Sequence, residues 1–130
     1  MFLDSTFLID ILRGKPQAIS FLQEKQSTPL FTSEVNVFEL VEGAYASEEK
    51  IQVRLEKVFG LLSRMTVLPL DRKAALKAGE LCSRLSREGK TIGEIDCLIA
   101  GIALSNGIST ILTENKSHFD RIKEIKVISY

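Results

Sequence analysis

The chain has 130 residues, of which 45% are hydrophobic and 26% charged, and this composition excludes an intrinsically disordered protein. A chain of this length fits one domain, residues 1–130, which buries about two thirds of its unfolded surface. The 17 basic residues balance the 17 acidic ones, so no overall positive charge indicates a nucleic-acid partner, although a local basic patch or a bound metal would supply it.

Cysteine usage and hydropathy restrict the cellular setting. Cys82 and Cys97 have no CxxC spacing and no companion histidine, so we interpret both as reduced thiols of the core. The chain opens without a basic leader, and no apolar run approaches the ~18 residues of a membrane span. We therefore expect a soluble cytoplasmic protein with no membrane contact.

The first half of the chain is predicted to form two short strands and four helices. The segment 4–6 supplies capping oxygens to the first helix, Gly14 ends that helix, and Pro16 suits the first turn of the next. Ser33 caps the third helix, whose predicted core face carries Phe38, Val41, Ala44 and Tyr45. In chain order these elements lie at residues 1–3, 7–12, 16–22, 30–32, 34–46 and 47–64.

The second half is predicted to alternate strands and helices in the same way. Pro69 stops a strand, and Asp71 starts a long helix with Ala75, Ala78, Leu81 and Leu85 on one side. The helix over 95–105 is apolar on nearly all sides, which predicts a central buried helix. In chain order the elements lie at residues 66–68, 71–88, 95–105, 109–112, 116–121 and 126–129.

Short strands that alternate with helices predict an α/β domain with a mainly parallel sheet covered on both faces. Ligand sites in such sheets lie beyond the carboxyl ends of the strands. Asp4 and the segment 113–115 each follow a predicted strand directly, so both are expected at this edge.

Four acidic or amide residues stand where apolar segments begin or end, namely Asp4, Glu39, Asp96 and Asn115. Carboxylate and amide oxygens are ligands that Mg²⁺ and Mn²⁺ prefer, and two such ions roughly 3.5 to 4 Å apart hydrolyse phosphodiesters without a protein nucleophile. That chemistry suits a chain with one histidine and no Ser/His/Asp spacing.

Two of these acids also have simple structural explanations. Asp4 is equally well explained as the amino-terminal cap of the first helix. Glu39 lies on a stripe with Asn36 and Glu42, and this stripe can be the solvated face of an amphipathic helix.

The remaining candidates are also ambiguous. Asp96 in the first turn of a helix complements the helix dipole, a role that is compatible with metal binding. Asn115 after a strand is an ordinary turn former, and we interpret His118 as a surface or turn residue. Arg84, Arg87 and Lys90 form either a solvated basic run or an RNA-backbone contact.

Four segments, in order, resemble the motifs of the PIN-domain family, in particular the VapC-type toxins of prokaryotic toxin–antitoxin pairs. The resemblance covers essentially the whole chain. Its motifs are LDSTFLID at residues 3–10, FEL followed by GA at 38–44, GEIDCLIA at 93–100, and ILTEN followed by FDRI at 111–122.

This resemblance implies a PIN-like three-layer α/β/α sandwich and a metal-dependent endoribonuclease. It implies that Asp4, Glu39 and Asp96 bind Mg²⁺ or Mn²⁺, that Asn115 completes the site, and that Thr113 positions a water or a neighbouring ligand. The fourth position is often Asp in relatives, so Asn115 removes one negative charge and leaves open whether one or two metals bind. Glu94 and Glu114 are the nearest substitutes.

The resemblance also implies partners, namely an RNA substrate, a cognate antitoxin that blocks the acidic pocket, and a second copy in a homodimer. The alternative function is a non-catalytic PIN-fold binding or regulatory module, which Asn115 and the neutral charge favour. A phosphoacceptor receiver domain lacks support because Asp4 has no adjoining acid and no Asp ends a middle strand.

Overall fold

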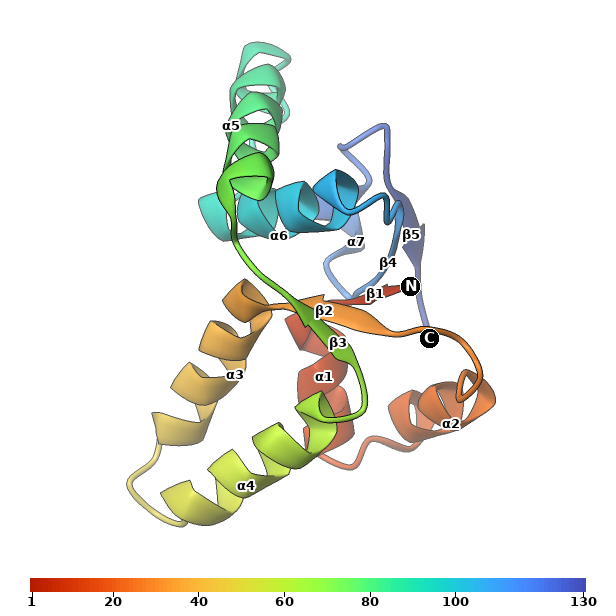
Figure 1. The fold of residues 1–130 in the computed structure, drawn as a ribbon, viewed down its shortest axis with the longest axis vertical. Coiled ribbons are helices and arrows are strands. Elements are labelled where there is room, and N and C mark those ends of the chain that lie inside the picture. The colour runs from red at the N-terminus through yellow and green to blue at the C-terminus, as the bar shows by residue number, and fades with distance from the viewer.

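The structure, a computed structural model, describes residues 1–130 and places a five-stranded parallel sheet between two layers of helices (Figure 1). No helix combines the length and apolar character that crossing a bilayer requires. The strands are β1 (Phe2–Leu3), β2 (Phe31–Ser33), β3 (Thr66–Leu68), β4 (Thr110–Leu112) and β5 (Lys126–Ile128). The helices are α1 (Ser5–Leu12), α2 (Pro16–Glu24), α3 (Glu34–Tyr45), α4 (Ile51–Leu62), α5 (Arg72–Arg87), α6 (Glu94–Ser105) and α7 (Lys116–Phe119).

The first strand of the chain is the central strand of the sheet, whose order is β3-β2-β1-β4-β5. Every neighbouring pair is parallel, and β1 pairs with β4 through Phe2 opposite Ile111 and Leu3 opposite Leu112. All carboxyl ends therefore lie at one edge, so the residues that follow β1, β2 and β4 come together there.

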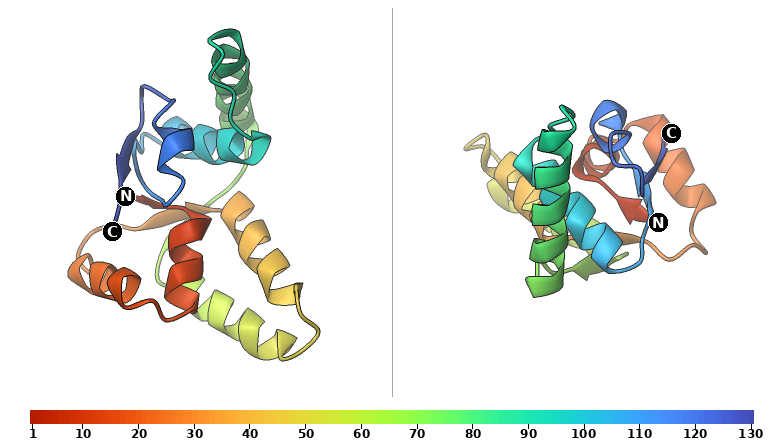
Figure 2. Two further views of the ribbon diagram at one scale, coloured as in Figure 1. Left: turned by 180° about the vertical axis from the view of Figure 1, so that it is seen from behind. Right: turned by 90° about the horizontal axis from the view of Figure 1, so that it is seen from above.

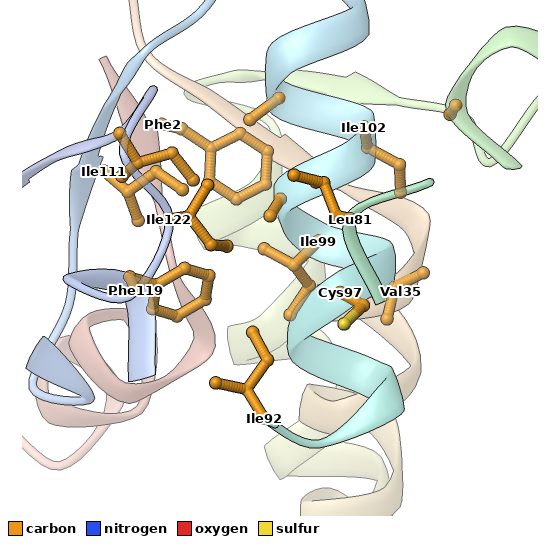
Figure 3. Close-up of a cluster of buried hydrophobic side chains, with 14 of the residues drawn as sticks. Phe2, Val35, Leu81, Ile92, Cys97, Ile99, Ile102, Ile111, Phe119 and Ile122 are labelled. Carbon is orange, nitrogen blue, oxygen red and sulfur yellow. The ribbon is translucent and has the colours of Figure 1, made fainter. Parts of the chain in front are cut away.

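Each face of the sheet has its own hydrophobic core, because successive strand residues point to opposite faces. Phe2 and Ile111 pack with α5, α6 and α7 in the core of Figure 3, whereas Leu3 and Leu112 pack with the helices of the other layer. Figure 1 shows α1 to α4 below the sheet and α5 to α7 above it. The predicted three-layer architecture and parallel sheet are confirmed.

The predicted core faces of two helices were partly wrong. Phe38 and Tyr45 are each 57% exposed, whereas α3 buries the predicted Ala44 together with Val35, Asn36 and Leu40. In α5 the predicted Ala78, Leu81 and Leu85 are buried, but Ala75 is exposed and Ala74 is buried in its place. In α3 the polar Asn36 takes a core position because it finds hydrogen-bond partners there, and the apolar Phe38 and Tyr45 lie on the outer side.

The helix predicted over 47–64 begins later, at Ile51, because the chain makes a tight turn between α3 and α4. Lys50 has a left-handed backbone conformation with φ of 55° and precedes the first residue of α4. The guanidinium of Arg54 donates to the carbonyl oxygens of Ala44 and Ser47, which fixes this turn between the two helices.

The closest approach in the upper layer is the contact of α6 with α5 at Gly101. A Cβ at Gly101 would lie 2.7 Å from both Cβ and N of Ala78 and 2.8 Å from the carbonyl oxygen of Ala74. These distances are too short for any side chain, so glycine sets the separation of the two helices.

We expect Gly101→Ala to destabilise the fold by about 2 kcal/mol or more, because two helix backbones must separate. The matched control is Gly79→Ala in α5, where a Cβ would meet nothing within 4 Å. That change is expected to stabilise the protein by ~0.5–1 kcal/mol through helix propensity. Urea unfolding measures both, and equal effects of the two substitutions would contradict the packing argument.

Candidate active site

Asp4 follows β1 directly and is 2% exposed, so its carboxylate lies in the protein interior. Thr113 Oγ1 donates to Asp4 Oδ2 at 2.7 Å, and Asn36 Nδ2 donates to Asp4 Oδ1 at 3.1 Å. Asp4 occupies the amino-terminal cap position of α1, as the alternative explanation expected, but its side chain makes no capping bond to the helix. The carboxylate instead joins the ends of β1 and β4 to the start of α3.

Asn36 and Ser5 connect Asp4 to Glu39. Asn36 Nδ2 also donates to Ser5 Oγ at 2.9 Å, and Ser5 Oγ donates to Glu39 Oε1 at 2.7 Å. The amide oxygen of Asn36 accepts from Ser33 Oγ at 2.6 Å, which fixes the orientation of the amide. Asn36 is fully buried, Glu39 is half-buried and Glu42 is exposed, so the stripe runs from the interior to the surface and only its end at Glu42 is a solvated helix face.

Asp96 lies in the first turn of α6 with 14% of its side chain exposed, and its partner is His118 of α7. His118 Nδ1 is 2.6 Å from Asp96 Oδ2. The histidine is 44% exposed, as the prediction of a surface residue required, but its contact with a candidate ligand was not predicted.

The fourth motif contributes Thr113 to the buried site and Asn115 to its border. Thr113 is fully buried, and its hydroxyl accepts from the backbone N–H of Asn115 at 2.9 Å. Asn115 is half-buried at the amino-terminal cap of α7, and its side chain makes no capping bond. Glu94 and Glu114 are exposed, so neither replaces a buried ligand.

The three acids affect one another electrostatically. Burial raises the pKa of Asp4 above its ordinary value, and the charge of Asp96 adds to this rise against the hydrogen bond from Thr113. Burial likewise raises the pKa of Glu39, and the charges of Asp4 and Asp96 contribute in the same direction. Three carboxylates from β1, α3 and α6 therefore share one region, and no Lys or Arg side chain pairs with any of them.

This donor set has the chemistry of a site for a hard divalent cation. Carboxylate oxygens that are partly buried, mutually repulsive and without a Lys or Arg partner are stabilised by a positive ion. In the present arrangement no three acidic, histidine or cysteine side chains are close enough together to hold one. The residues fit a metal by chemistry, while their carboxylates stand further apart than a closed coordination shell.

Sequence reasoning missed four residues that contact this site, namely Asn36, Ser5, Thr6 and His118. Asn36 lay on the stripe that also contains Glu39, and a polar amide three residues before a candidate ligand was the available signal. Ser5 appeared only as a helix-capping residue. No local signal identified His118, because it is 22 residues from Asp96 in sequence.

The family model of the PIN domain matches residues 1–125, and the chain belongs to this family. It is similar to the tRNA(fMet)-specific endonuclease VapC of Salmonella typhimurium, with 32% identity over 96% of this chain and 93% of that protein. It is also similar to ribonuclease VapC2 of Haemophilus influenzae, with 31% identity over 92% of this chain and 89% of the relative.

Solved structures of toxin–antitoxin complexes have the same fold. The DNA-bound VapBC of Salmonella typhimurium aligns with a TM-score of 0.87 and 32% identity over 98% of this chain and 96% of that chain. VapBC2 of Rickettsia felis aligns with a TM-score of 0.89 over 99% of this chain and 97% of that chain. Its sequence identity of 24% supports the fold alone.

We expect the stability of the Asp4→Asn variant relative to the wild type to increase as the pH rises through the acidic range, in a buffer that contains EDTA. A carboxyl group with a raised pKa contributes stability below its ordinary value of 3.8, and this contribution is lost as pH rises through its folded value. Asparagine does not ionise, so the melting temperature of the variant minus that of the wild type should be larger at pH 7 than at pH 4.

The control is Asp10→Asn, for which the opposite slope is expected. The hydrogen bond from Tyr130, opposed by burial and aided by Lys15, lowers the pKa of Asp10. Ionised Asp10 therefore adds stability that is lost as pH falls through its folded value. Parallel slopes for the two variants in differential scanning fluorimetry would refute this electrostatic description.

Proposed function

We propose that the protein is a metal-dependent endoribonuclease and the toxin of a type II toxin–antitoxin pair. The observation that carries this proposal is the buried carboxylate of Asp4, which neutral donors hold near Glu39 and Asp96 with no Lys or Arg side chain paired to any of the three acids. The similarity to VapC ribonucleases over more than nine tenths of the chain supports the same activity.

Mg²⁺ or Mn²⁺ would be held by the carboxylates of Asp4, Glu39 and Asp96, with the amide oxygen of Asn115 at the border. Such an ion would supply Lewis-acid activation of a water and would neutralise the charge that develops as a phosphodiester is hydrolysed. Asn115 brings no charge of its own, so the charge available to hold a second ion is smaller than with four acids.

The surrounding residues position these carboxylates. Thr113 and Asn36 each hold one oxygen of Asp4, and Ser5 holds one oxygen of Glu39, so neutral donors orient both carboxylates. His118 holds Asp96 through Nδ1 in the same way. Asn36 keeps Asp4 and Ser5 in register because it donates to both.

RNA is the proposed substrate, and an antitoxin is the proposed protein partner. The relatives named for their activity are a tRNA(fMet)-specific endonuclease and a ribonuclease, and the similar solved structure is a VapBC complex. A cluster of unbalanced carboxylates attracts an Arg or Lys side chain, which is how an inhibitory segment would recognise the site. We also propose a homodimer, for which Phe38 and Tyr45 on α3 offer exposed apolar surface.

We expect Asp96→Asn to lower metal-dependent RNA cleavage by more than ~100-fold, because the change removes one charged ligand and its contact with His118. A tRNA(fMet) transcript and a panel of structured RNAs serve as substrates, with Mg²⁺ or Mn²⁺ against EDTA. Glu24→Gln is the control, since Glu24 is an exposed acid at the end of α2 and lies outside the four motifs. Undiminished cleavage by purified Asp96→Asn protein would refute the assignment.

We expect Mn²⁺ to raise the melting temperature of the wild type and to leave that of Asp4→Asn unchanged. An ion that binds only the folded state stabilises it by about 2.7 kcal/mol at a hundred-fold excess over the dissociation constant, or roughly 10 °C for a domain of this size. Calorimetric titration provides an independent readout. Absence of both the shift and the heat of binding would favour the non-catalytic binding module.

A further inference from the structure

Helices α1, α3 and α4 lie together in the lower helical layer (Figures 1 and 2), and a groove between them is lined by residues of all three. It consists of two adjoining hollows of about 350 and 360 Å³. Glu39 lines the first hollow, and the two hollows share Leu12 and Lys57 in their walls. The hollows therefore adjoin the acidic residues through Glu39, and we call them together the α1/α4 groove.

The charge of the α1/α4 groove is opposite to that of the acidic site. Its walls carry four basic residues, Arg13, Arg54, Lys57 and Arg64, and Glu39 is their one acidic residue. The chain as a whole has equal numbers of basic and acidic residues, so this lining is a local concentration of positive charge.

Three of these cations are free of protein partners. Arg13, Lys57 and Arg64 are exposed, and none of them makes a side-chain hydrogen bond or an ion pair. Arg54 is committed to the turn between α3 and α4, but its carbonyl partners leave its charge unbalanced. By contrast, Arg84 of the predicted basic run pairs with Glu80 and Glu124, so its charge is already balanced.

The remaining lining is aliphatic, with Leu40, Val58 and Leu61 buried at its base, and it contains no aromatic ring. Bases therefore have no stacking platform in the groove, and the groups available for recognition are the cations at its rim. Cations arranged along a channel bind the phosphates of a nucleic-acid backbone without reading its sequence.

We propose that the α1/α4 groove binds the RNA backbone on one side of the scissile phosphate, through Arg13, Lys57 and Arg64. This inference rests on the proposed nuclease function and adds the path of the substrate to it. A protein segment over the aliphatic base is the competing occupant. The excess of positive charge and the presence of Glu39 in the wall of the groove favour a polyphosphate backbone.

The test measures RNA binding by Asp96→Asn protein over a range of salt concentrations, with a short single-stranded RNA and a tRNA(fMet) transcript as probes. In that background each of Arg13→Gln, Lys57→Gln and Arg64→Gln should lower the slope of log affinity against log salt by about 0.7, and the triple variant by about 2. Arg87→Gln is the control, because Arg87 is an exposed cation of α5 that contacts Ser83.

Cleavage by the otherwise unchanged enzyme separates this inference from the proposed function. We expect the triple replacement to raise KM and leave kcat nearly unchanged, because backbone contacts remote from the reacting bond add uniform binding. If the wild type cleaves RNA and the triple replacement changes neither KM nor the salt dependence of binding, the groove assignment is overturned. The nuclease function would then still hold. A lower slope for Arg87→Gln alone would place the RNA on α5 and also overturn it.

Discussion

The buried carboxylate of Asp4 is the constraint on which the rest of the site depends. A carboxylate in the interior is costly unless donors surround it, and here Thr113 and Asn36 come from two other parts of the chain to supply them. The same bonds tie the ends of β1 and β4 to the start of α3. Satisfying one charge therefore fixes the relative positions of the elements that carry Glu39 and the fourth motif.

The architecture was predictable, and the faces of individual helices were less so. The order of strands and helices followed from hydrophobic periodicity, and parallel pairing followed from their alternation. Phe38, Tyr45 and Ala75 were placed inside because they are apolar, yet all three are exposed. Hydrophobic periodicity identifies an apolar stripe on a helix. It cannot reveal that a network of buried polar side chains will place a different face of that helix in the core.

Within the site, the sequence identified charged groups better than the groups that orient them. Asp4, Glu39 and Asp96 were proposed from the sequence. In the structure, burial and the charges of the neighbouring acids raise the pKa of both Asp4 and Glu39. Ser5, Asn36 and His118 have common structural roles elsewhere, so their types carry no signal until the fold brings them to a carboxylate. The basic groove was equally hidden, because its cations come from separate helices in a chain of zero net charge.

The central position of the first strand also restricts when the site can form during synthesis. β1 is made first, but one of its two neighbours in the sheet is β4, whose pairing spans 109 residues from Phe2 to Ile111. Such long-range parallel pairing is slow, and a growing chain cannot begin it until that segment has left the ribosome. Asp4 therefore has no Thr113 partner until residue 113 has left the ribosome, so up to that point the nascent chain carries Asp4 and Glu39 without their assembled arrangement.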